Sequence, residues 1–112
     1  MVRIADCANA NHLFCVSVTV EDIRALLECK KGYSIKVRNI RNVAILFDAL
    51  LDNDMIKWNW KAAMAKGGHM LSKNTGKAIS ATTLSSALSE IKKQPTPVSK
   101  RIVDDIRDIA MM

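Results

Sequence analysis

The chain has 112 residues, of which 49% are hydrophobic and 25% are charged. This length and composition exclude wholesale disorder and predict a single domain, 1–112, with one modest core. The longest uninterrupted apolar run, 43–47, is far too short to span a bilayer. The first twenty residues also lack the continuous apolar segment of a signal peptide, so we expect a cytoplasmic protein with no membrane partner.

Positive charge is concentrated in one part of the chain. The net charge is +6, and residues 57–102 hold nine lysines and arginines against a single acid, Glu90, while the remainder is slightly negative. Such asymmetry points to a polyanionic partner, usually a nucleic acid. The alternative is a lysine-rich, solvated surface that keeps the protein soluble.

The N-terminal segment, 1–39, is predicted to combine strands with one helix. The sequence before Thr19 shows no helical period, but the alternation in FCVSVTV (14–20) predicts a short strand. Thr19 has the features of an N-cap, with Asp22 at the capping-box position, and predicts a helix to about residue 29. YSIKV (33–37) is a second candidate strand, which could pair with the first in a short β-hairpin.

The helical module, 40–112, is predicted from helical periodicity and from cap and break residues. Aromatic residues are scarce, so aliphatic and methionine side chains must build the core. The predicted helices are 40–51 after the N-cap Asn39, a short Ala/Met run within 55–65 that ends at Gly67 and Gly68, a helix from the N-cap Ser80, and a last helix from Pro97 after Thr96. The predicted fold is therefore mainly α, a small helical bundle.

The stretch SKNTGKAISATTLSSALSEIKK (72–93) contains a lysine-bearing glycine loop that leads into a helix. If its apolar stripe of Leu84, Ala87, Leu88 and Ile91 faces the core, a row of small hydroxyls is left for solvent or for a partner. Such hydroxyls can donate to phosphate oxygens. The predicted nucleic-acid-binding residues are Lys73, Lys77, Thr82, Thr83, Ser86, Lys92 and Lys93. The alternative is an ordinary solvated helix face.

The segment before this loop would serve as the supporting helix of a helix-turn-helix-like pair. KWNWKAAMAKG (57–67) precedes the Ser80 helix, although the intervening loop is longer than the usual three- or four-residue turn. The tryptophans Trp58 and Trp60 could stack on a base. The alternative is a core role, in which they close the gap between the long helix and the Ser80 helix.

Catalytic and metal-binding patterns are weak in this sequence. His12 and His69 lack partners at a recognised catalytic spacing, so we expect no enzyme, and His69 within GGHM is expected at the surface. Cys7, His12, Cys15 and Cys29 form C-x4-H-x2-C-x13-C, which could supply four zinc ligands, but no tight cysteine knuckle is present. We therefore expect free cysteines that behave as small buried hydrophobes, and no metal or cofactor.

From Ile40 onward the order of features is similar to a known family. The segments NVAILFDALLDNDMI, KWNWKAAMA and LSKNTGKAISATTLSSALSEIKK, with the proline-broken last helix, resemble the C-terminal region of RteC-type proteins and related small proteins of Bacteroidetes mobile elements. The similarity covers roughly residues 40–107, and its best marker is SKNTGKAIS…LSSALS. It implies a winged-helix-like module, although this chain has QPTP and another helix where a β-wing would be expected.

These patterns together predict a DNA-binding regulatory or accessory protein of a mobile element. It would contact DNA through its basic C-terminal half. The alternative is a non-catalytic protein-interaction module or a homo-oligomer with no nucleic-acid role.

Overall fold

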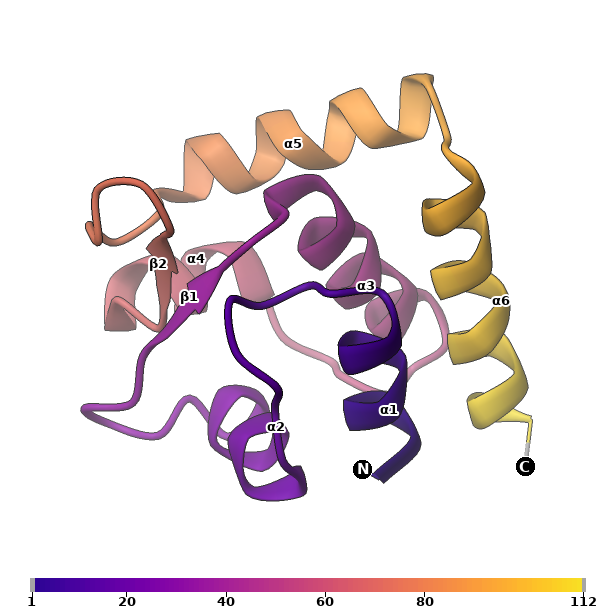
Figure 1. Ribbon diagram of the computed structural model, residues 1–112, viewed down its shortest axis with the longest axis horizontal. Coiled ribbons are helices and arrows are strands. Elements are labelled where there is room, and N and C mark those ends of the chain that lie inside the picture. The colour runs from indigo at the N-terminus through magenta and orange to yellow at the C-terminus, as the bar shows by residue number, and fades with distance from the viewer. Residues whose placement is uncertain (1, 112) are drawn as a thin grey trace.

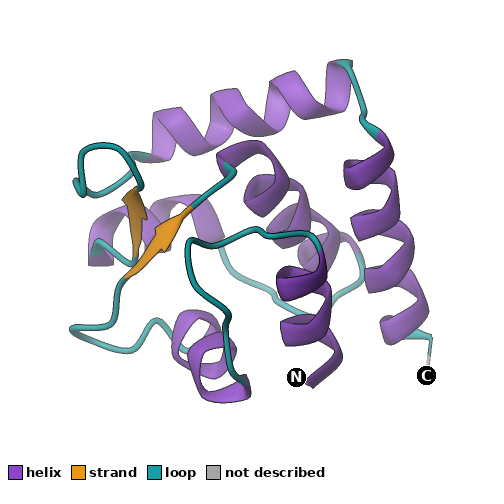
Figure 2. Ribbon diagram, viewed as in Figure 1, coloured by secondary structure: helices purple, strands orange, loops and turns teal. Residues whose placement is uncertain are grey.

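The computed structural model describes residues 2–111 and is mainly helical, as predicted (Figure 2). Its elements in chain order are α1 (Val2–Ala10), α2 (Val20–Leu27), β1 (Ile35–Val37), α3 (Ile40–Asp52), α4 (Trp60–Gly67), β2 (Met70–Ser72), α5 (Ala81–Lys93) and α6 (Pro97–Ala110). No helix among the described residues is both long and apolar enough to cross a membrane.

Helix α3 is the centre of the core. Its N-cap Asn39 accepts a hydrogen bond from the Asn42 N–H at 3.0 Å, and every residue from 42 to 50 is buried. A helix that is buried on all sides must be covered by several neighbours. Helix α5 crosses it at the top of Figure 1, α6 packs along it at the right, and both ends of the chain lie at the bottom.

The two short strands pair in parallel, with Ile35 opposite Met70 and Val37 opposite Ser72. The predicted strand at 33–37 is therefore confirmed, but its main partner is β2. The predicted strand at 14–20 is wrong, because only Phe14 makes a bridge, antiparallel to Val37.

This segment is not a strand because the backbone N–H and carbonyl groups of Val18 are already hydrogen-bonded to a side chain and cannot pair with a neighbouring strand. The Asn9 side chain accepts from the Val18 N–H at 2.7 Å and donates to the Val18 carbonyl at 2.9 Å. The alternation of apolar residues in this segment instead reflects the anchoring of Phe14 and Val18 in the core.

Helix α1 was not predicted from the sequence. Its buried residues are Ile4, Ala5, Cys7 and Ala8, which share one helical face but include only one large apolar side chain. Because the other buried residues of this stripe are small, the helical periodicity of hydrophobicity in the sequence is weak. The close packing that small residues allow places α1 against α2 and α6.

The predicted helix starts are confirmed in detail. Thr19 and Asp22 form a capping box, which lowers the pKa of Asp22 mainly through the hydrogen bond from the Thr19 backbone N–H. Ser80 accepts from the Thr83 N–H at 3.1 Å. Thr96 caps α6 with Pro97 in its first turn.

The two tryptophans belong to the core. Trp60 is 1% exposed and packs on Phe47 of α3 with ring centroids 5.3 Å apart, while Trp58 is half-buried at the edge of the core. Trp60 is therefore closed to base stacking, and the predicted core role is confirmed.

His69 is not at the surface, contrary to the prediction. It is 3% exposed, and its Nδ1 lies 2.7 Å from the Tyr33 carbonyl oxygen. The backbone carbonyl of His69 also accepts from the Ile35 N–H at 2.9 Å. This residue ties the end of α4 to the entry of β1, so its role is structural.

Candidate nucleic-acid interface

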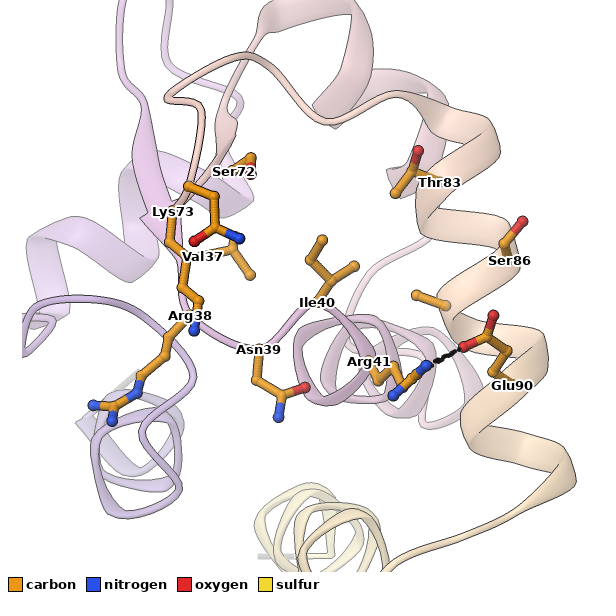
Figure 3. A pocket seen from close by; sticks show the side chains of 12 residues that line it. Val37, Arg38, Asn39, Ile40, Arg41, Ser72, Lys73, Thr83, Ser86 and Glu90 are labelled. Carbon is orange, nitrogen blue, oxygen red and sulfur yellow. Dashed lines mark hydrogen bonds and ion pairs between the residues drawn. The ribbon is translucent and has the colours of Figure 1, made fainter.

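A groove with a cavity volume of about 430 Å³ lies between the β1–α3 junction, the turn after β2 and one face of α5 (Figure 3). It is lined by Val37, Arg38, Asn39, Ile40, Arg41, Ser72, Lys73, Asn74, Thr83, Ser86, Ala87 and Glu90. Three segments that are far apart in the sequence therefore build one surface.

The first wall carries two cations. The parallel register brings Val37 opposite Ser72, so Arg38 and Lys73 follow at the same end of the two strands. Arg38 and Lys73 are both exposed, and neither forms an ion pair with any other described residue. Two neighbouring cations without an acid between them favour an anion.

The second wall is a stripe of α5. Thr83, Ser86 and Glu90 follow the i, i+3, i+7 spacing of one helical face (Figure 3). The apolar residues Leu84, Ala87, Leu88 and Ile91 are buried, as the sequence predicted, and Ala87 lies at the boundary between the core and the groove. This wall therefore carries two small hydroxyls, of which that of Thr83 already forms a hydrogen bond with Ser80 Oγ at 2.9 Å.

An ion pair crosses the groove from α3 to α5. The Nη2 and Nε atoms of Arg41 lie 2.6 and 2.7 Å from the same Glu90 oxygen, Oε2. The two side chains are 61% and 56% exposed, so water screens the pair. The groove thus holds three cations and one acid.

The structure gathers only some of the predicted binding residues. Lys73, Thr83 and Ser86 line the groove. Lys77 and Thr82 are exposed next to it, on the turn after β2 and in the first turn of α5. Lys93 lies at the other end of α5, where it lines an adjoining hollow that shares Arg41 and Glu90 with the groove.

Lys92 has a structural partner. Its Nζ lies 3.0 Å from Oδ2 of Asp48, whose side chain is 12% exposed. A carboxylate this far buried needs a compensating charge, and Lys92 supplies it on the side of α5 that faces α3. We therefore remove Lys92 from the set of candidate contacts.

Sequence reasoning missed Arg38 and Arg41. They lie outside residues 57–102, in the remainder of the chain, whose net charge is slightly negative. Because the charge was summed over that whole remainder, a local cluster of basic residues was overlooked. Residues 29–47 contain five basic residues and no acid. A shorter charge window would have found this basic run.

The proposed zinc ligands are not assembled. Among residues 2–111, no group of three or more His, Cys, Asp or Glu side chains is placed to hold a metal ion. Burial, followed by the nearby Asp105 carboxylate, raises the pKa of the Cys7 thiol to about 11, whereas zinc binds the thiolate. The expectation of buried cysteines holds for Cys7, but Cys15 is exposed and Cys29 is half-buried.

No protein-family model, curated protein or solved structure matches this chain. The resemblance to RteC-type proteins therefore stays a prediction that rests on the residues quoted for it.

Proposed function

We propose that the protein binds DNA through the groove, the adjoining turn at 73–77 and the face of α5 that carries Thr83 and Ser86. The main support for this proposal is that one groove contains both predicted contact residues and additional arginines. The predicted residues are Lys73, Thr83 and Ser86, and the arginines are Arg38 and Arg41. We also propose that the protein is cytoplasmic and acts as a regulator or accessory factor of a mobile element. Both of these proposals rest on the sequence.

The chemistry of the groove suits a phosphate backbone. Arginine and lysine neutralise phosphates and release the counterions bound to them, while serine and threonine hydroxyls donate to phosphate oxygens. Such contacts position a protein on the duplex without selecting a base sequence. We therefore expect binding to random-sequence DNA, with any sequence preference added by groups outside the groove.

A second hollow favours the alternative function, docking of a protein partner. It has a volume of about 380 Å³ between α3, α5 and α6, and its apolar part is formed by Ile45, Ile91, Pro95 and Val103. An apolar hollow of this kind can accept a side chain of a partner. The charge distribution favours the groove as the main site.

A salt series with labelled random-sequence duplex DNA tests the proposed function. We expect affinity to fall steeply with salt, with a slope near −0.9 per phosphate contact on a logarithmic plot. Fluorescence anisotropy gives the dissociation constant at each salt concentration. Affinity that stays flat between low and physiological salt would contradict DNA binding by this basic surface.

Substitutions on α5 and on the turn test the location of the interface. The Thr83→Ala, Ser86→Ala double variant should weaken binding about fivefold or more, since each lost hydrogen bond contributes about 0.5–1.5 kcal/mol. Lys77→Ala should reduce the salt slope by about one. The matched controls are the Ser85→Ala, Ser89→Ala double variant and Lys100→Ala, which remove the same groups outside the groove. Parent-like binding by both test variants would show that α5 is an ordinary solvated helix.

A further inference from the structure

The Arg41–Glu90 pair lines the groove between α3 and α5. Arg41 projects from the first turn of α3 and Glu90 from the facing helix, and the dashed line in Figure 3 joins them across the groove. Both nitrogens of Arg41 that point to Glu90 engage a single carboxylate oxygen. The guanidinium is therefore already held by an internal anion.

We propose that the groove is a phosphodiester-binding site in which Glu90 competes with the bound phosphate for Arg41. Arg38 and Lys73 hold the approaching phosphate, Arg41 turns from the carboxylate to it, and the charge of Glu90 limits the affinity that results. This inference rests on the proposed function, because it concerns how tightly the same groove binds a nucleic-acid backbone.

The competition follows from the chemistry of the three groups. A guanidinium donates two parallel hydrogen bonds to a phosphate as readily as to a carboxylate. More than half of the Arg41 and Glu90 side-chain surface is exposed, so water can replace either partner as the pair opens. A phosphate would also meet Arg38 and Lys73, for which no ion pair with other described residues is present.

Neutralising Glu90 should therefore strengthen binding. We expect Glu90→Gln to lower the dissociation constant for random-sequence duplex DNA about two- to fivefold at about 0.15 M salt, because an exposed ion pair no longer has to be broken before Arg41 binds a phosphate. The salt slope should become steeper by at most about one, because Glu90 no longer offsets the charge that Arg41 brings to the phosphate. A merely structural ion pair would instead lower the melting temperature and leave affinity unchanged.

Asp104→Asn is the matched control. Asp104 pairs with Arg107 at 2.8 Å, the two side chains are 57–59% exposed, and both lie on α6, which forms no part of the groove. The substitution changes the net charge by the same amount as Glu90→Gln. At about 0.15 M salt, where the Debye length is about 8 Å, we expect it to change affinity by less than about twofold.

A double-mutant cycle with Arg41→Ala separates the outcomes. In the Arg41→Ala background, Glu90→Gln should lose most of its gain, because no guanidinium is left to release. If the parent fails to bind DNA, the proposed function is wrong. If the parent binds but Glu90→Gln is no stronger than Asp104→Asn, or gains as much without Arg41, the inference is wrong and the proposed function stands.

Discussion

Single residues in this protein owe their roles to neighbours that are distant in the sequence. His69 is buried because its ring fills the space beside Gly67 and reaches the Tyr33 carbonyl. A Cβ atom added at Gly67 would clash with the imidazole ring of His69. The glycine at 67 is thus required by packing, although it lies in a helix where glycine is intrinsically unfavourable.

Gly67→Ala should destabilise the protein. Helix propensity alone predicts a gain of up to about 1 kcal/mol, but the clash with a buried ring should cost about 1–3 kcal/mol. Urea unfolding of Gly67→Ala measures the net change. In a His69→Ala background the same substitution should become neutral or stabilising, and a gain in stability with His69 present would contradict the packing argument.

At the scale of elements, α5 has two faces with different tasks. Leu84, Leu88 and Ile91 pack into the core, and Thr83 and Ser86 open onto the groove. Sequence periodicity was sufficient to separate these faces because α5 is amphipathic. It was insufficient for α1, where small residues replace a large apolar stripe.

Substitutions on the two faces of α5 should have separate effects on stability. Leu88→Ala should cost about 2–5 kcal/mol through the cavity it leaves, and Ser80→Ala about 1 kcal/mol through the lost N-cap. The Thr83→Ala, Ser86→Ala double variant should stay within about 0.5 kcal/mol of the parent per substitution. Thermal melting followed by circular dichroism compares them. A double variant as unstable as Leu88→Ala would mean that the hydroxyls support the fold.

At the scale of the whole molecule, one aliphatic core around α3 holds all six helices of the described residues. The buried set runs from Ile4 in α1 to Ile106 in α6. A continuous core of this extent supplies hydrophobic stabilisation without a structural metal.

The protein should therefore fold without zinc. A strong chelator should leave the helical circular dichroism and the melting temperature unchanged. Zinc-dependent domains lose structure under the same treatment, because the free energy of metal binding is part of their folding free energy. Loss of structure would show that Cys7, His12, Cys15 and Cys29 come together as ligands after all.

The sequence by itself determined the features that depend on neighbouring residues. The caps at Thr19, Ser80 and Thr96 and the apolar stripe of α5 are such features, because each needs contacts within a few positions. The concentration of lysines after residue 57 was equally visible.

Only the tertiary structure decided which distant segments meet. The parallel pairing of β1 with β2 depends on the two helices between them, and the burial of His69 depends on that pairing. The groove depends on it too, since the register that puts Val37 opposite Ser72 brings Arg38 and Lys73 to the same end of the sheet. Arg41 then meets Glu90 because α5 packs across α3, a contact that the burial of two apolar faces produces and no local pattern of charges encodes.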